Sequence, residues 1–344
     1  MASKRVGKHT WSYSGQVRIL AGAAVAGPKE GEGQLKGKFD HTYPDLYAEQ
    51  DSWEKAERKM MEDAVNKAVE KAGLQMNQID TFLAGDLLNQ NISASFTARQ
   101  NQLPLIGMFG ACSASMLTLS TGAALVDAGF SDHAVVAVSS HNATAERQYR
   151  YPTEYGGQKP PTAQWTVTGS GAGVVGRGTT GPILRYATMG KVVDMGVKNP
   201  FDMGAAMAPA AAETIEVHFQ DTGLTPADYD LIITGDLAGV GHPIATELLA
   251  KKGLELGDIF QDCGLMIYND EQESFAGASG CASSALVMYA HILEEMNQGR
   301  LSRVMVVATG ALMNPVSYQQ GESIPCIAHA VTLETDVVSG GEKG

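Results

Sequence analysis

The stretch Leu105-Ile-Gly-Met-Phe-Gly110-Ala-Cys112-Ser-Ala-Ser115 decides the expected fold of this chain. Its apolar start predicts a buried strand at 105–109, and the apolar residues after it recur at helical spacing as far as Gly129. Cys112 therefore stands where a strand turns into a helix. The positive end of that helix favours a thiolate or a bound anion. Spacing alone, however, favours a buried cysteine that packs as a small apolar group.

An internal repeat runs through the chain. Residues 73–87 match residues 223–237 at six of fifteen positions, with an offset of 230 − 80 = 150. Cys112 and the helix after it match Cys281 and its helix, with an offset of 281 − 112 = 169. Because the elements follow the same order in both halves, the sequence predicts one duplicated βαβ-rich unit.

A glycine-rich run, Thr166-Val-Thr-Gly-Ser-Gly-Ala-Gly-Val-Val175, predicts a strand, and Gly181-Pro182 and a further strand-like run follow it. No helix follows, so the run is not a dinucleotide-binding fingerprint. With the cysteine and the repeat, it resembles the thiolase superfamily, and most closely the β-ketoacyl-acyl-carrier-protein synthase III enzymes.

This resemblance implies an α/β fold with two duplicated halves in a five-layered α-β-α-β-α core. The halves are expected at 16–180 and 181–335, with loose termini at 1–15 and 336–344. Residues 141–165 have no periodicity and are expected to form an irregular loop over the mouth of the pocket.

Four longer strings resemble one family of this superfamily, the stage V sporulation protein AD family. They are LAGDLLNQ at 83–90, SSHNATAERQ at 139–148, YPTEYGGQK at 151–159 and SIPCIAH at 323–329. The resemblance implies a non-enzymatic protein of spore formation that binds dipicolinic acid, alone or as its calcium chelate, for uptake into the spore through a membrane channel complex. It also implies a place in the forespore, peripheral at the inner membrane through protein partners, and a homodimer paired near 105–109.

The departures from the resembled enzymes concern the groups that assist the cysteine. Condensing enzymes add a His and an Asn from the second half, which stabilise the oxyanion. At the His position this chain has Asp236, which would repel an oxyanion, and at the Asn position it has Ala278, which has no side-chain donor. Losing one such donor costs about 10²–10³ in rate, so the loss of both predicts a binding site.

Dipicolinate is a flat dianion that needs hydrogen-bond donors, cationic groups and a stacking surface. A helix start supplies backbone donors, arginines can hold a carboxylate at two points, and an aromatic ring can stack on the ligand. The candidate ligand-binding residues are Cys112, Ser113, Phe109, Asp86, His141, Asn142, Arg147, Arg150, His242 and Asp236. Tyr149 and Tyr151 are further candidates for stacking.

Each candidate also has a structural alternative. Asp86 and Asp236 can cap turns at the ends of duplicated strands. If they instead line the ligand site, a bound calcium ion would have to offset their repulsion of an anionic ligand. Arg147 can pair with a glutamate at the surface, and His141 can be a hydrogen-bonded core residue. His242 can replace the missing His in space, or begin a helix that Pro243 opens.

Composition limits the remaining possibilities. The net charge of −13 disfavours nucleic acid and anionic lipid as direct partners. No run of eighteen apolar residues predicts a membrane span, and the N-terminus does not resemble a signal peptide. The four cysteines contain no Cys-x-x-Cys pair, which fits a reducing compartment and predicts neither a metal site nor a cofactor.

Two other functions stay open at this point. The chain could be a condensing or acyl-transfer enzyme that uses Cys112 with His242 or His141 as base. It could also be a scaffold for channel subunits in which the pocket is vestigial.

Overall fold

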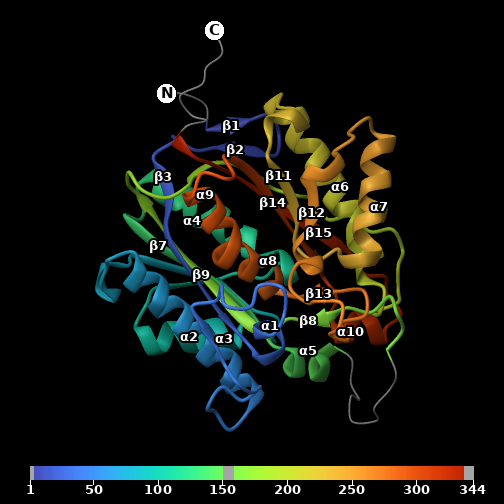
Figure 1. Cartoon of the computed structure of the whole chain (residues 1–344), viewed down its shortest axis with the longest axis horizontal. Helices are drawn as coiled ribbons and strands as arrows, with labels where there is room; N and C mark the ends of the chain where they lie inside the picture. Colours follow the sequence, from blue (N-terminus) through green and yellow to red (C-terminus); the bar gives the residue numbers. More distant parts are fainter. Residues whose placement is uncertain (1–3, 150–158, 337–344) are drawn as a thin grey trace.

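The computed structural model describes residues 4–149 and 159–336. Two half-sheets meet edge to edge, where Arg18 of β3 pairs with Ile183 of β10 (Figure 1). The first half-sheet has the order β3 (Val17–Ala26), β9 (Gly169–Arg177), β7 (His133–Ser140), β5 (Thr81–Gly85) and β6 (Leu105–Gly107). The second has the order β10 (Ile183–Thr188), β15 (Cys326–Glu334), β14 (Arg303–Ala311), β11 (Leu231–Thr234) and β12 (Phe260–Asp262). The two orders are the same by element, so the predicted duplication is a property of the fold.

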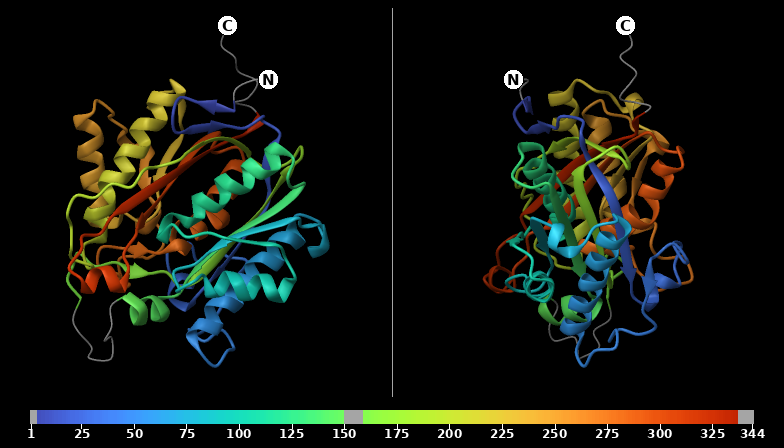
Figure 2. Two further views of the ribbon diagram at one scale, coloured as in Figure 1. Left: turned by 180° about the vertical axis from the view of Figure 1, so that it is seen from behind. Right: turned by 90° about the vertical axis from the view of Figure 1, so that its left-hand side faces the viewer.

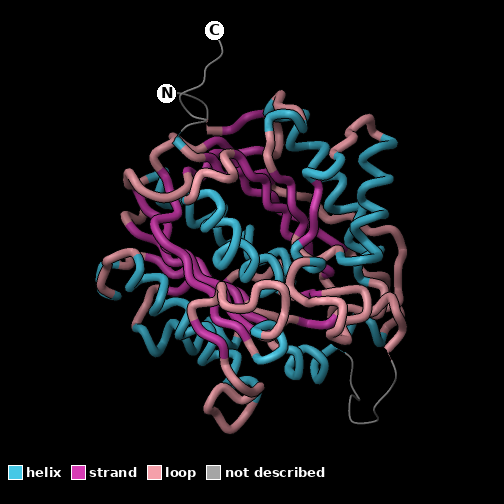
Figure 3. Tube along the Cα trace, viewed as in Figure 1, coloured by secondary structure: helices cyan, strands magenta, loops and turns pink. Residues whose placement is uncertain are grey.

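Helices make the other three layers. The outer helices are α2 (Trp53–Lys71) and α3 (Ile92–Asn101) on the first half-sheet, and α6 (Met203–Thr222) and α7 (Ala238–Lys251) on the second. Between the half-sheets lie α4 (Ala114–Ala128) and the continuous run α8 (Cys281–Val287), η7 (Met288–Ile292) and α9 (Leu293–Asn297), of which η7 is a π-helix (Figure 2). Figure 3 shows the continuous run of α8, η7 and α9 between the strands of the two half-sheets. The predicted five-layered α-β-α-β-α fold is therefore confirmed.

Shorter elements complete the described chain. They are β1 (Arg5–Val6), β2 (Thr10–Ser12), α1 (Pro28–Gly31), β4 (His41–Thr42), η1 (Met76–Gln78), η2 (Ala111–Ser113), α5 (Asn142–Tyr149), β8 (Trp165–Thr166), η4 (Pro226–Asp228), η5 (Gly257–Ile259), η6 (Cys263–Leu265), β13 (Ala278–Ser279) and α10 (Pro315–Gln319). In this described part, no helix combines the length and the apolar character that a membrane span requires.

Several local expectations were wrong. The apolar run at 105–109 is not buried, because β6 is the last strand of its half-sheet and Leu105, Ile106 and Phe109 are exposed. Part of the expected irregular loop at 141–165 is the helix α5. The residues before 15 are not all loose, since β2 pairs with β10. Pro243 does not open a helix but lies inside α7.

The glycine-rich strand β9 gives the middle helix layer room to approach the sheet. A Cβ atom on Gly171 would lie 2.7 Å from Cβ of Ala285 and 2.8 Å from the ring of Tyr289. One on Gly173 would lie 2.8 Å from the same ring, and one on Gly22 of β3 only 2.5 Å from it. These three glycines form a flat floor for Tyr289, so their role is close packing and not phosphate binding.

We therefore predict that Gly171→Ala lowers the free energy of unfolding by about 1–3 kcal/mol, because the added methyl group overpacks a filled core. Gly107→Ala is the matched control, since it also lies on a strand and its nearest neighbour would be an amide nitrogen at 3.5 Å. The control should change stability by less than about 0.5 kcal/mol. Urea unfolding followed by circular dichroism measures both, and equal effects would contradict this account of β9.

Candidate functional site

Cys112 lies at the junction between the two halves of the fold. It is in η2, directly before α4, and the residue before it, Ala111, has a left-handed backbone with φ of 49°. Such strain costs about 1–3 kcal/mol and persists only where neighbouring contacts hold it. One such contact is the hydrogen bond from Cys281 Sγ to the carbonyl oxygen of Ala111, at 3.1 Å. The repeat thus brings its two equivalent cysteines against the same turn.

The cavity in front of Cys112 is small, with a volume of about 40 Å³. That volume has room for about three water molecules and not for an aromatic dicarboxylate. Its lining residues are Leu87, Ala111, Cys112, Ala145, Tyr149, Thr166, Met203, Ser279, Ala311 and Met313. None of these described residues is a histidine, an asparagine or an arginine.

Asp236 is the acidic group beside the sulfur. Its carboxylate is buried, and its negative charge acts on the thiol of Cys112. One oxygen accepts from the Thr309 hydroxyl at 2.5 Å, and the other accepts from the amide of Gly280 at 3.1 Å. From the sequence, Asp236 was expected at the position of the enzymes' histidine, and in the structure it lies beside the cysteine.

This arrangement overturns the expected thiolate. Burial raises the pKa of the Cys112 thiol well above its usual value, and the negative charge of Asp236 raises it further. Burial also raises the pKa of Asp236, to about 6, so this carboxyl is mostly ionised at neutral pH. The helix field is therefore weaker than desolvation and a neighbouring acid at this cysteine. Cys112 is a neutral thiol.

Of the candidates on α5 and just before it, Tyr149 lines the cavity, and His141, Asn142 and Arg147 do not. His141 is buried, with Nε2 donating to the carbonyl of Leu46 at 2.8 Å and Nδ1 accepting from the amide of Ala143 at 3.1 Å. Burial lowers the pKa of His141, which keeps it neutral. Asn142 donates its backbone amide to Thr168, and Arg147 pairs with Glu54 at 2.8 Å on the surface. Arg150 and Tyr151 lie outside the described residues.

Three further candidates make hydrogen bonds or ring contacts within the fold. Asp86 is buried and accepts from the amides of Leu88 and Ala94, so it holds the turn before α3 and the first turn of that helix. The Ser113 hydroxyl donates to the carbonyl of Gly110 at 2.6 Å. His242 is in α7, where its ring stacks on Phe260 with centroids 4.5 Å apart. Of the nine candidates that the structure describes, only Cys112 lines the inner cavity.

A second hollow of about 250 Å³ lies outside the cavity, and we call it the vestibule. Leu87, Tyr149 and Met313 line both hollows and separate them. The Tyr149 hydroxyl holds this barrier closed by donating to the carbonyl of Leu87 at 2.6 Å. The remaining lining residues are Leu88, Asn89, Gln90, Asn91, Phe109, Leu312, Asn314 and Pro315. The candidate Phe109 therefore belongs to the vestibule.

The vestibule is rich in carboxamides, which sequence reasoning missed. Asn89, Gln90, Asn91 and Asn314 all line it. Gln90 and Asn91 have left-handed backbones, with φ of 58° and 52°, and Oδ1 of Asn91 has no hydrogen-bond partner among the described residues. The run of three consecutive carboxamide residues at 89–91, directly after a predicted strand, was the available signal.

A pair of buried acids lies beneath the vestibule wall. Glu57 of α2 accepts from the hydroxyls of Ser139 and Thr144, at 2.9 and 2.8 Å. Burial raises the pKa of Glu57, and the negative charge of Asp86 raises it further. Thr144 belongs to α5, and Asp86 precedes the vestibule residues of its own segment. The two buried acids therefore link α2 to two segments that line the vestibule.

Comparisons with known proteins identify the family and the fold. The family model described as stage V sporulation protein AD matches residues 7–334. Stage V sporulation protein AD of Bacillus subtilis (strain 168) is 55% identical over 332 residues, which cover 96% of this chain and 98% of that protein.

Solved structures of condensing enzymes share the fold at low identity. The 3-oxoacyl-[acyl-carrier-protein] synthase III of Aquifex aeolicus has a TM-score of 0.57 at 13% identity, over 93% of this chain and all of that one. Xanthomonas campestris OleA, in a co-crystal with cerulenin, has a TM-score of 0.61 at 14% identity, over 94% of this chain and 98% of that one. At this identity, the likeness concerns the fold alone.

We predict that Asp236→Asn accelerates alkylation of Cys112 by iodoacetamide, because removing the carboxylate charge lowers the pKa of the thiol. Each unit by which that pKa falls raises the thiolate fraction about tenfold. The control is Asp86→Asn, the equivalent residue of the repeat, which should leave the rate unchanged. Peptide mass mapping across a pH series measures the modification at Cys112, and equal rates in both variants would exclude an electrostatic role for Asp236.

We also predict a pH-dependent gain in stability from Glu57→Gln. The folded state raises the pKa of Glu57 above its ordinary value of 4.5, so stability is complete below about that pH and is lost as rising pH ionises the buried acid. Gln cannot ionise, so the stability difference from the wild type should grow between about pH 4.5 and about pH 8, the pKa of Glu57 in the folded state, and level off above that. Glu70→Gln, on the exposed face of α2, is the control. Melting temperatures measure both variants, and a constant difference would contradict the assignment.

Proposed function

The chain belongs to the stage V sporulation protein AD family, and from this premise we propose that it binds dipicolinic acid without transforming it. The proposed binding site is the vestibule above Cys112, and the proposed role is delivery of the ligand to a membrane channel complex during spore formation. The observation that carries the proposal is the buried carboxylate of Asp236 beside the buried thiol of Cys112. A cysteine held neutral by an acid can line a site but is a poor nucleophile.

The same contact argues against condensing or acyl-transfer activity. A tetrahedral intermediate at the sulfur would place an oxyanion near the Asp236 carboxylate, and the repulsion would raise the barrier. Neither histidine candidate is placed as a base for the thiol, since His141 is engaged with Leu46, and His242 of α7 stacks on Phe260 of β12. The enzyme alternative therefore requires a rearrangement of the described residues around Cys112.

The vestibule suits a flat dicarboxylate in size and chemistry. Its aromatic side chains, Phe109 and Tyr149, offer stacking surfaces, and its carboxamides offer N–H donors to carboxylate oxygens. The amide oxygens of these lining residues are also ligands that Ca²⁺ accepts. Because the described lining contains no cationic side chain and the chain carries a net charge of −13, a neutral calcium chelate fits better than the free dianion.

The proposed partners follow from exposed surfaces and from the family. The outer edge of β6 has no strand partner in the described chain, and this strand exposes Leu105 and Ile106. Pairing of this edge with its counterpart in a second copy would cover these side chains and give a homodimer. We place the protein in the forespore, peripheral at the inner membrane through channel subunits, on family membership alone.

We predict that Phe109→Ala weakens binding of calcium dipicolinate by about fivefold, because stacking on an aromatic ring contributes about 1 kcal/mol. Phe130→Ala is the matched control, since Phe130 is 80% exposed after the end of α4 and does not line the vestibule. Calorimetric titration with dipicolinate, with and without calcium, measures the affinity and the preferred form of the ligand.

The outcomes separate the alternatives. A folded protein that takes up no dipicolinate at millimolar concentration, in either form, would overturn the proposal. A stable acyl adduct on Cys112 after incubation with acyl-coenzyme A, detected by intact mass, would instead support the enzyme. Normal dipicolinate content in spores whose protein cannot bind the ligand would support a scaffold with a vestigial pocket.

A further inference from the structure

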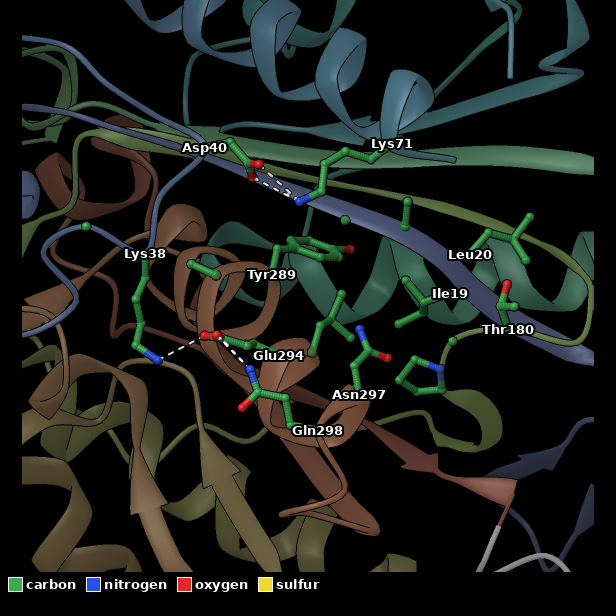
Figure 4. A pocket seen from close by; sticks show the side chains of 17 residues that line it. Ile19, Leu20, Lys38, Asp40, Lys71, Thr180, Tyr289, Glu294, Asn297 and Gln298 are labelled. Atoms are coloured by element: carbon green, nitrogen blue, oxygen red, sulfur yellow. Dashed lines mark hydrogen bonds and ion pairs between the residues drawn. The ribbon is translucent and has the colours of Figure 1, made fainter. Parts of the chain in front are cut away.

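A groove of about 690 Å³ shares no lining residue with the Cys112 cavity or the vestibule (Figure 4). Its floor is residues 19–22 of β3. One wall is the end of the middle helix run, from Tyr289 to Gln298, and the other consists of residues 37–40 and Lys71. Residues 180–182 close one end. The groove therefore follows the outer edge of the first half-sheet.

This edge of β3 is open in its middle. On its other edge β3 pairs with β9 along its length, but here it meets β10 only at Arg18 and β4 only at Val25 and Ala26. No described strand pairs with residues 20–23 on the groove side. The stretch is bounded by two hydrogen bonds, from the Ile19 amide to the carbonyl of Pro182 and from the Ala24 amide to Asp40.

The duplication supplies a counterpart for this open edge. β3 and β10 are the first strands of the two halves, and they meet antiparallel at Arg18 and Ile183. Each strand has a register shift two residues after this pair, at Leu20 in β3 and at Arg185 in β10. The offset between equivalent residues is therefore 183 − 18 = 165 at the pair and 185 − 20 = 165 at the register shift. Residues 21–23 of β3 therefore correspond to residues 186–188 of β10.

In the second half, this position is filled by a strand. β2 pairs antiparallel with residues 186–188, and its Trp11 lies opposite Ala187. The flanking Tyr13 amide donates to the carbonyl of Arg185, and the Met189 amide donates to the carbonyl of His9. By the offset of 165, the groove has Leu20 in place of Arg185 and Gly22 in place of Ala187. The molecule thus contains an example of what fits this edge.

The chemistry of the walls suits a neutral polypeptide segment. Lys38 pairs with Glu294 at 3.0 Å, and Lys71 pairs with Asp40 at 3.0 Å, so the two ion pairs leave little net charge on the rim. The ring of Tyr289 covers Gly22, so a large group on a residue opposite Gly22 would lie beside that ring. The ring of Tyr289, which lies over Gly22, and the side chain of Leu293 give that group an apolar surface.

We propose that this groove receives an extended segment of a partner polypeptide, which adds as an antiparallel strand to residues 21–23 of β3. The segment places a large apolar side chain against Tyr289 and Leu293, and its main chain bonds the free edge at Leu20 and Gly22. Strand addition of this kind obtains affinity from main-chain hydrogen bonds and specificity from alternate side chains. The proposal is independent of the ligand in the vestibule.

The test uses the full chain and a synthetic peptide copied from its own residues 8–14, acetylated and amidated. Hydrogen–deuterium exchange should slow at residues 20–23 when the peptide is present at millimolar concentration. Asn297→Trp fills the groove from the exposed end of α9 and should weaken peptide binding by about tenfold or more. Gln220→Trp, on the exposed face of α6, is the matched control and should bind as the wild type does.

Three outcomes would overturn the proposal. The first is unchanged exchange at residues 20–23 in the presence of peptide. The second is protection only at residues 183–188, which would mean that the peptide replaces β2. The third is a chain that self-associates in light scattering and loses that association in the Asn297→Trp variant, which would make a second copy the occupant.

Discussion

The structure depends on how closely the two halves can approach at their shared centre. The hydroxyls of Ser115 in α4 and Ser284 in α8 are 2.7 Å apart, and these residues are equivalent in the repeat, since 284 − 115 = 169. β14 comes as near, because a Cβ atom on Gly310 would lie 2.3 Å from the carbonyl oxygen of Gly110. These contacts hold the turn at η2 in place, and with it the strained Ala111 and the position of Cys112.

Tight packing at the centre also limits what the site can hold. The cavity beside Cys112 is nearly filled by Leu87, Tyr149 and Met313, and the buried carboxylate of Asp236 lies beside the sulfur. A chemical site of this fold would need open space and a group that stabilises negative charge. Neither is found around the thiol among the described residues. The larger space for a ligand lies farther out, in the vestibule. The chemistry of binding is consequently that of amides and aromatic rings.

Sequence patterns predicted the elements that local spacing defines. The helix after Cys112 shows apolar periodicity, and Gly129 ends it with a left-handed φ of 80°. The strand at 105–109 was misjudged because an apolar run at a sheet edge looks the same as one in the core. β2 was missed because only its pairing with β10 makes it a strand. The place of Cys112 at the start of a helix was predicted from the sequence, whereas its raised thiol pKa and the vestibule required the three-dimensional placement of Asp236 and of α5 against residues 87–91.

Equivalent residues of the two halves have different roles. For Asp86 and Asp236, the difference follows from which carboxylate caps the helix that comes next. Asp86 caps the first turn of α3, which fixes its carboxylate in the fold. In the second half the corresponding helix start, at Leu237 and Ala238, is capped by Asp262 from β12. Asp236 therefore does not cap this helix, and it accepts hydrogen bonds from Thr309 and Gly280 beside the thiol. The repeat therefore determines where a residue stands, but the neighbours that only one half contains determine what it does, as β2 does for the edge of β10.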